Sequence, residues 1–339
     1  MRLAAVLVGA ALAGGACIGG SAAEPREPGG RYLVYTSSPG APNETVWIGD
    51  VEARRMRRLT RGGYGLVSPN GRTIAISRRA GIFALSPDGR GGHFVARGRP
   101  AAWLPDSRHL LAIRAKALVS IDLQDGAVAV IERREVVTWS ISPDGGSIAY
   151  DVYRKSPPSG ECWFDVYTAH VDGTAKRRLT TGGRSSDPVW GPNSIAYAYR
   201  PPGRHCFEPR VWRMDADGRD KAPVMPTLPK RFANNGYYGV RPYAWVEGRP
   251  LLLATVPTEW GLELALVDSR DGRTRKPDLD PRPRLRRPMY VDDASRDARY
   301  VVGAACAAEA PCEIWTYSVL DRRARKLRTG HVAYPDWNR

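Results

Sequence analysis

The stretch WSISPDGGSIAY, residues 139–150, decides the fold of this chain. An apolar run ends at Ser142, a polar bend follows from Pro143 to Gly146, and a second apolar run begins at once. Asp-Gly between two alternating runs is a strong signal for a tight turn between antiparallel strands. The stretch therefore predicts a strand, a turn and a strand, and it raises the question whether the turn also holds a metal or does chemistry.

Looser copies of this stretch recur along the chain. Each has an aromatic or apolar entry, a polar bend and a β-rich run, and the copies lie at 66–77, 102–114, 189–199, 244–255 and 290–304. A second pattern, two short strands around a polar turn, alternates with the first at 46–60, 81–95, 117–131, 165–180, 210–224, 262–276 and 313–327. Self-similarity at a period of a few tens of residues indicates a repeat architecture.

The order of the repeats predicts how the fold closes. With the strands of one unit called a, b, c and d, the seven b strands begin near Arg31, Arg72, Arg108, Gly146, Asn193, Arg249 and Ala298. The chain starts on a b strand and ends on an a strand, HVAYPDWNR at 331–339, which can complete the first unit. We expect an all-β fold, a β-propeller of four-stranded antiparallel blades whose C-terminal strand joins the first blade. Seven blades are favoured, and six are the alternative.

The sequences SPDGGSIAY at 142–150 and DVYTAHVDGTAKRRLTTGG at 165–183 resemble the repeat of the TolB-type, WD-like β-propeller family. The resemblance covers residues 31–339 as a repeat pattern, and its best copies lie at 136–183 and 64–98. It implies a β-propeller fold; together with the export signal and the missing hydrolase motif described below, we expect an exported propeller without an attached hydrolase domain.

The N-terminus has the form of a bacterial export signal. Arg2 precedes an apolar stretch, Leu3 to Ala13, that is too short to span a membrane. We expect a signal peptide at 1–23, a linker at 24–30 and a single β-propeller domain at 31–339. The alternative is a lipobox-like signal that ends at Cys17 and places a lipid anchor there. Both predict a periplasmic, cell-surface or secreted protein without a transmembrane span.

The remaining cysteines are even in number, as expected for disulfides in an exported chain. Cys162 and Cys206 fall in b–c loops of neighbouring blades, so a bond between them would staple two blades. Cys306 and Cys312 flank one b–c loop and would pin it as a hairpin. Structural disulfides are favoured over a redox role or a metal site.

The chain carries a net charge of +16. In an exported protein this charge favours contact with anionic surfaces or acidic polymers and not specific binding of nucleic acid, although an arginine-rich composition explains it as well. The motifs Gly-x-Ser-x-Gly, His-Glu-x-x-His and the phosphate-binding loop do not occur. We therefore predict no catalytic residue, metal ligand or cofactor. Asp215-Ala216-Asp217-Gly218 hints at a calcium loop, but a hairpin turn is favoured there.

Two recurrent residue types have structural interpretations. The arginine pairs at 57–58 and 177–178 fall on predicted outer d strands, where basic side chains commonly prevent edge-to-edge aggregation. A polyanion-binding stripe is the alternative. Tryptophans recur at one place in the a strands, which favours packing between blades over sugar stacking; they are Trp103, Trp139, Trp190, Trp245 and Trp337.

Long connections fall on one face of the predicted propeller. The b–c loops at 37–45, 154–164, 200–209 and 304–312 and the d–a loops at 226–238 and 279–288 share it. Loops on a rigid scaffold commonly carry function. The candidate binding residues there are Trp163, Phe164, Arg204, His205, Phe207, Tyr237, Tyr238, Trp260, Arg284 and Arg286. Aromatic side chains beside arginine suit an interface with a protein or an acidic glycan. The alternative is a structural role, in which the aromatic side chains only cover the disulfides and the bases of the loops.

The sequence favours a non-catalytic, monomeric binding scaffold at the cell envelope, with a protein or an anionic envelope polymer as its partner. The alternative is a lyase or hydrolase with its site at the mouth of the central channel. That site would need converging acidic and histidine side chains. The loop residues that could supply them are Glu161, Asp187, His205, Glu208 and Glu259.

Overall fold

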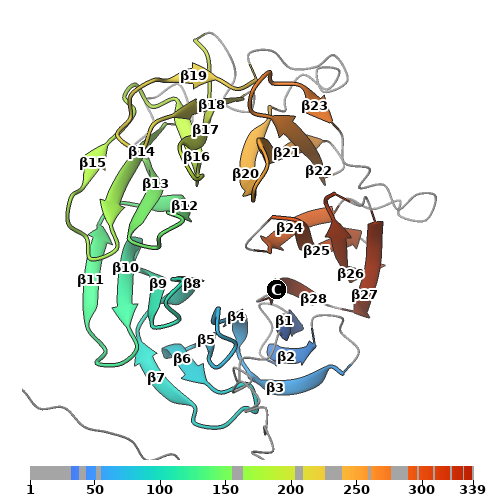
Figure 1. Ribbon diagram of the computed structural model, residues 1–339. Helices are drawn as coiled ribbons and strands as arrows, with labels where there is room; N and C mark the ends of the chain where they lie inside the picture. Colours follow the sequence, from blue (N-terminus) through green and yellow to red (C-terminus); the bar gives the residue numbers. More distant parts are fainter. Residues whose placement is uncertain are drawn as a thin grey trace, which may run out of the picture.

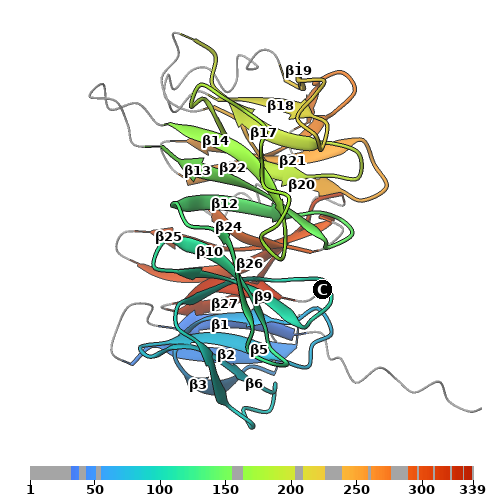
Figure 2. The same cartoon turned by 90° about the vertical axis from the view of Figure 1, so that its left-hand side faces the viewer.

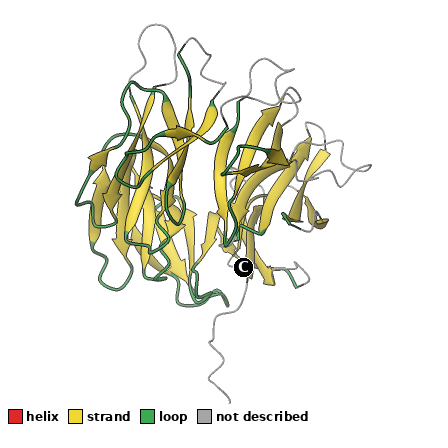
Figure 3. Ribbon diagram, turned by 45° about the horizontal axis from the view of Figure 1, so that its top comes forward, coloured by secondary structure: helices red, strands yellow, loops and turns green. Residues whose placement is uncertain are grey.

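The computed structural model describes residues 32–37, 43–50, 55–154, 163–202, 209–225, 239–258, 261–275, 289–295, 298–307, 310–320, 323–330 and 332–337. These residues form strands and loops without any helix (Figure 3). No membrane-spanning helix occurs among them. The strands form seven blades around a common centre (Figure 1), as the favoured interpretation of the sequence predicts.

The first four blades follow one another along the chain, each with its first-named strand innermost (Figure 1). Blade 1 contains β28 (Val332–Trp337), β1 (Tyr32–Ser37), β2 (Thr45–Asp50) and β3 (Arg57–Arg61). Blade 2 contains β4 (Gly63–Val67), β5 (Ile74–Arg78), β6 (Gly81–Leu85) and β7 (His93–Ala96). Blade 3 contains β8 (Arg99–Trp103), β9 (His109–Arg114), β10 (Ala117–Asp122) and β11 (Val128–Glu132). Blade 4 contains β12 (Val136–Ile141), β13 (Ser147–Tyr153), β14 (Phe164–His170) and β15 (Arg177–Arg178).

The last three blades have the same antiparallel order. Blade 5 contains β16 (Ser185–Trp190), β17 (Ile195–Tyr199), β18 (Arg210–Met214) and β19 (Ala222–Pro223). Blade 6 contains β20 (Arg241–Val246), β21 (Leu251–Thr258), β22 (Gly261–Asp268) and β23 (Thr274–Arg275). Blade 7 contains β24 (Met289–Ala294), β25 (Tyr300–Ala307), β26 (Ala310–Ser318) and β27 (Arg323–Gly330). A pairing of Leu262 with Met289 joins blades 6 and 7 into one continuous sheet.

Both ends of the described chain contribute to blade 1. β28 pairs antiparallel with β1, with Leu33 opposite Trp337 and Ser37 opposite Val332. The prediction that the C-terminal strand joins the first blade is therefore confirmed.

The hydrophobic core consists of seven clusters, one for each pair of neighbouring blades. Between blades 3 and 4, for example, Leu111 and Leu118 pack with Ile148 and Tyr150. The last cluster brings Leu33 and Tyr35 of blade 1 together with Val302 and Ile314 of blade 7, among others. Because each blade is covered on both faces, its middle strands are apolar along nearly their whole length.

The turn inside WSISPDGGSIAY is a tight bend between β12 and β13, as predicted. Gly145 N–H donates to the Ser142 carbonyl at 2.9 Å, and Asp144 Oδ1 accepts from Gly146 N–H at 3.0 Å. Gly145 has a φ of 76°, which a residue with a Cβ rarely adopts. The carboxylate of Asp144 is thus occupied by its own turn.

The tryptophans of the inner strands link neighbouring blades, in agreement with the packing interpretation. Trp103 Nε1 donates to the Leu66 carbonyl of blade 2 at 3.1 Å. Trp245 Nε1 donates to the Val189 carbonyl of blade 5 at 3.2 Å. The side chain of Trp337 lies outside the described residues.

One predicted loop is wrong in its bounds. We expect a b–c loop at 304–312 from the sequence, but β25 continues to Ala307 and β26 begins at Ala310. Pairing persists to Ala307 opposite Ala310, so sheet contacts override the low strand preference of this alanine-rich segment. Cys306 and Cys312 therefore lie in strands. Cys312 is disulfide-bonded, and its pairing with Cys306 stays a prediction.

Candidate functional site

The connections between strands divide into two faces. The loop face carries the b–c and d–a connections, such as 78–81 and 179–185, and the turn face carries the a–b and c–d turns, such as 142–147 and 215–219. Figure 2 shows the blades from the side, with their connections at opposite strand ends. The predicted turn at Asp215 lies on the turn face, where Gly218 N–H donates to the Asp215 carbonyl at 2.8 Å, as in an ordinary hairpin.

Of the predicted binding residues, the structure describes Trp163 and Phe164, at the start of β14 on the loop face. Asp187 is the one described member of the alternative catalytic set. The other predicted site residues lie outside the described part of the chain; they are Cys17, Glu161, Cys162, Arg204, His205, Cys206, Phe207, Glu208, Tyr237, Tyr238, Glu259, Trp260, Arg284 and Arg286.

Trp163 and Phe164 are anchored against the d–a connection that follows blade 4. Phe164 N–H donates to the Gly183 carbonyl at 3.3 Å, and its ring packs against Tyr153 with centroids 5.4 Å apart. The indole of Trp163 covers Gly183 so closely that a Cβ there would lie 2.6 Å from its ring. The buried Trp163 Nε1 has no hydrogen-bond partner among the described residues. These aromatics thus form a wall of the loop face.

Beside this wall lies a cavity of about 50 Å³ between blades 4 and 5, to which blade 6 contributes Arg241. Its lining residues are Phe164, Gly183, Arg184, Ser185, Ser186, Ala198, Arg200, Pro209 and Arg241. Ser185 is 3% exposed and Arg200 is 6% exposed, so polar groups are held deep in the wall. Three arginine residues, Arg184, Arg200 and Arg241, therefore line one small cavity.

Only part of this positive charge is neutralised by described residues. Arg241 Nη1 lies 2.9 Å from Asp187 Oδ2, which also accepts from the Ser186 hydroxyl at 2.6 Å. By contrast, the guanidinium of Arg184 makes no hydrogen bond or ion pair with any residue that the structure describes. The Ser185 hydroxyl likewise has no partner within the described ranges. The cavity thus offers a free cation next to a free hydroxyl group.

Asp151 of blade 4 lies beside Asp187 and links blade 4 to blade 5. Its buried carboxylate accepts from Thr138 N–H at 2.9 Å, Thr138 Oγ1 at 2.6 Å and Asp187 N–H at 3.0 Å. Burial, with the nearby Asp187 charge second, raises the pKa of Asp151 to about 6. Its lone pairs are engaged by the fold, so it serves as a structural carboxylate.

Asp165 fixes the same region from blade 4. Its fully buried carboxylate accepts from Arg178 Nη2 at 2.6 Å, Arg154 Nη1 at 3.2 Å and Gly183 N–H at 3.0 Å. The prediction for the 177–178 pair is therefore incomplete, because Arg178 also has this internal partner. Sequence spacing gave no signal for the contact, since Asp165 and Arg178 are on different strands.

Basic side chains dominate the connections and strand ends of the loop face. The described ones are Arg61, Arg78, Arg79, Arg97, Arg99, Arg114, Lys116, Arg133, Arg134, Arg154, Arg178, Arg184, Arg200, Arg210 and Arg241, and the acidic ones are Glu44, Glu132, Glu135, Asp165 and Asp187. The exposed guanidinium groups of Arg79, Arg97, Arg114 and Arg133 make no ion pair with described residues.

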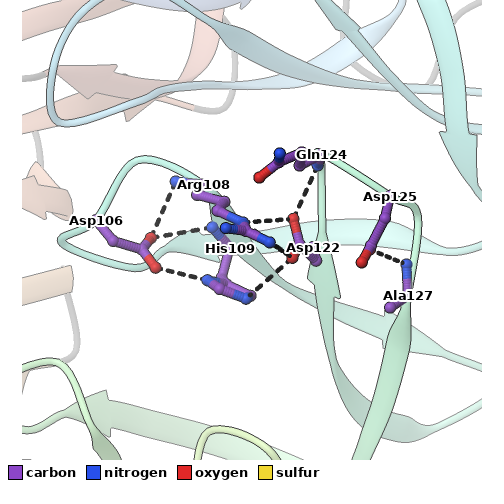
Figure 4. A network of polar contacts seen from close by, with 7 residues as sticks. All are labelled: Asp106, Arg108, His109, Asp122, Gln124, Asp125 and Ala127. Atoms are coloured by element: carbon purple, nitrogen blue, oxygen red, sulfur yellow. Dashed lines mark hydrogen bonds and ion pairs between the residues drawn. The ribbon is translucent and has the colours of Figure 1, made fainter.

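The turn face is different, because its arginines commonly meet an aspartate of their own turn. Examples are Arg90 with Asp88 at 3.8 Å, Arg219 with Asp217 at 3.2 Å and Arg273 with Asp271 at 3.3 Å. In blade 3, Arg108 Nε donates to both oxygens of Asp122, and His109 bridges Asp106 and Asp122 (Figure 4). The Arg108 hydrogen bonds lower the pKa of Asp122 to about 2. Arginines without an ion pair among the described residues occur on both faces, for example Arg72 and Arg249 on the turn face, but the loop face has fewer acidic side chains to balance its arginines.

Within the ranges that the structure describes, no cluster of three or more His, Cys, Asp or Glu side chains could hold a metal ion. The sequence matches no protein-family model and no curated protein. Among solved structures, TolB from Acinetobacter baumannii aligns with a TM-score of 0.52 and 14% identity, over 91% of this chain and 66% of that one. The chain shares the β-propeller fold of this protein.

The chain also resembles the β-propeller domain of the trilobed protease from Pyrococcus furiosus, described as having an open velcro topology. The TM-score is 0.63 at 16% identity, over 88% of this chain and 95% of that one. An oligogalacturonate lyase in complex with manganese aligns with a TM-score of 0.57 at 12% identity, over 89% and 86% of the two chains. The chain spans a little under two thirds of the length of the Acinetobacter TolB. At these identities the likeness shows the fold alone.

Proposed function

We propose that this β-propeller is a non-catalytic binding scaffold of the bacterial cell envelope that recognises an acidic protein partner through its loop face. The observation that supports it most is the contrast between the two faces. The turn face carries many aspartates, which pair with arginines such as Arg90 and Arg273, whereas the loop face carries few acidic side chains and leaves Arg79 and Arg97 without an ion pair among the described residues. The export signal predicted at the N-terminus supports the location.

Uncompensated charge on one face favours association with a partner of opposite sign. Complementary potentials raise the rate of encounter and select against basic partners. Arginine also presents a planar fork of donors that fits carboxylates in two-point hydrogen bonds. An acidic protein surface is therefore the partner that this face fits best.

The acidic groups of the site support binding rather than catalysis. Asp165 is held by two arginines, and Asp151 by two neighbouring blades. Asp187 forms an ion pair with Arg241. A general acid or base needs a carboxyl group free to exchange a proton with a substrate, and these three are engaged in holding the fold.

The test compares equal charge changes on the two faces. Binding of the mature chain, residues 24–339, to immobilised poly-L-glutamate is measured at low and high salt. We expect Arg79→Glu with Arg97→Glu to weaken binding roughly tenfold at low salt. Arg90→Glu with Arg273→Glu is the matched turn-face control and should change it less than about twofold. Equal losses in both double variants would contradict a role of the loop face.

The class of partner is tested by crosslinking in the envelope. A photo-crosslinking amino acid replaces Arg79 on the loop face or Arg90 on the turn face. A protein adduct found only from position 79 supports the proposal. A protease-resistant polymer adduct from that position would replace the protein partner with an acidic polymer.

A further inference from the structure

We propose that the cavity between blades 4 and 5 binds a single carboxylate group of an acidic peptide segment, with Arg184 as its ion-pair partner and Ser185 as its hydrogen-bond donor. This inference rests on the proposed function and names the part of the loop face that would give it selectivity. It starts from the unpaired cation and hydroxyl that line the cavity.

The backbone holds Arg184 firmly from both sides. Its carbonyl accepts from Arg200 N–H at 2.9 Å, and it forms a parallel bridge with Phe164. The preceding residue, Gly183, is fixed because its N–H donates to the buried Asp165 carboxylate at 3.0 Å. These contacts fix the backbone from which the Arg184 side chain extends, and the ligand would order the side chain itself when it binds.

Ser185 adds a second polar group to the cavity lining. It is only 3% exposed, and its hydroxyl makes no hydrogen bond with the described residues. The hydroxyl oxygen itself keeps some solvent access, so a ligand in the cavity can reach it. A carboxylate oxygen beside Arg184 would accept from this hydroxyl.

The charge of the cavity favours a monoanion. Arg241 is already paired with Asp187, which leaves Arg184 as the guanidinium without a partner in the described lining. One guanidinium and one carboxylate match in charge and in two-point geometry. A phosphate monoester carries more charge than this lining balances.

The surroundings favour a peptide over a continuous acidic polymer. A stiff acidic polysaccharide presents its carboxylates at fixed intervals and needs a row of free cations, but Arg154 and Arg178 next to the cavity are taken up by Asp165. A flexible acidic peptide can instead enter the cavity with one side chain. A cavity of about 50 Å³ has room for a few water-sized groups, which suits one carboxylate and its methylene beside Phe164. An acidic side chain on a peptide meets both conditions.

The test is calorimetric titration of the mature chain with hexaglutamate. We expect Arg184→Gln to weaken binding about tenfold or more and Ser185→Ala about threefold. Arg79→Gln removes one charge from the same face away from the cavity and should weaken binding less than about twofold. Thermal melts confirm that each variant is folded.

The outcomes separate this proposal from the proposed function. If Arg184→Gln weakens hexaglutamate binding no more than Arg79→Gln does, while the double reversal at Arg79 and Arg97 abolishes it, the carboxylate pocket is wrong and the loop-face function stands. If none of these variants affects binding, both fall. Inorganic phosphate and a uronate oligomer are titrated in the same way. If either one binds more tightly than hexaglutamate and loses affinity in Arg184→Gln, the ligand of the cavity is not a peptide carboxylate.

Discussion

At the scale of the residue, the site depends on close contacts that leave no space for a larger side chain. Gly183 lies under the indole of Trp163, and its N–H donates to Asp165. Its φ of 71° is in the region that favours glycine. Gly183 is therefore required both by its positive φ and by its contact with Trp163, and it sets the backbone position of Arg184.

We predict that Gly183→Ala destabilises the protein more than the neighbouring Gly182→Ala. Both positions have positive φ, so both variants should lose about 1 kcal/mol through backbone strain. An added Cβ meets Trp163 at Gly183 and nothing within 4 Å at Gly182. The clash should add at least about 1 kcal/mol to the loss at Gly183. Urea unfolding of both variants measures the difference, and equal losses would show that Trp163 moves aside.

At the scale of the element, the inner strands are attached to neighbouring blades at their bulges. The a–b pairs of all seven blades show a register shift. In blades 2 and 5 the bulged residue has positive φ, at Tyr64 and Asp187. Each donates its N–H to the b strand of the preceding blade, to Thr36 Oγ1 at 3.1 Å and to Asp151 Oδ2 at 3.0 Å. The bulge thus exposes a donor that bonds to the preceding blade.

The raised pKa of Asp151 predicts that the free energy of unfolding depends on pH. Because the folded pKa of about 6 is above the unfolded value near 3.8, the folded state binds more protons in that interval. The free energy of unfolding should therefore fall as pH rises from about 4 to about 6, by on the order of 2 kcal/mol relative to Asp151→Asn. Urea unfolding of both proteins across this range measures it. A constant difference between them would contradict the raised pKa.

At the scale of the whole molecule, blade 1 links the two ends of the described chain. β28 supplies its inner strand, and Val332 packs in the cluster that joins blades 7 and 1. Deleting residues 331–339 should therefore expose Leu33 and Val302 and cost several kcal/mol. Thermal melting of the deletion variant, with removal of residues 338–339 alone as the control, tests this. An unchanged midpoint in the longer deletion would show that the ring is stable without β28.

The sequence predicted the features that local patterns encode. The Asp-Gly turn at Asp144, the alternation of the strands and the a strand at 331–339 all follow from hydrophobic period and turn chemistry. The strand pairing around Cys306 was missed because alanines carry little strand preference. The cavity was not predictable, since Arg184, Arg200 and Arg241 come from separate connections and meet only when blades 4, 5 and 6 pack. The intervals between these arginines along the sequence do not indicate that they lie close together in the fold.

The pairing of β28 with β1 has a consequence for the order of events in the cell. β1 is the first of the described strands to be synthesised and β28 is the last, so the first blade stays incomplete until the rest of the ring has been made. A chain with this topology cannot reach its native state while its tail is still in the ribosome or in a translocation channel. For a protein whose N-terminus predicts export, this delay would keep the chain threadable until it has crossed the membrane.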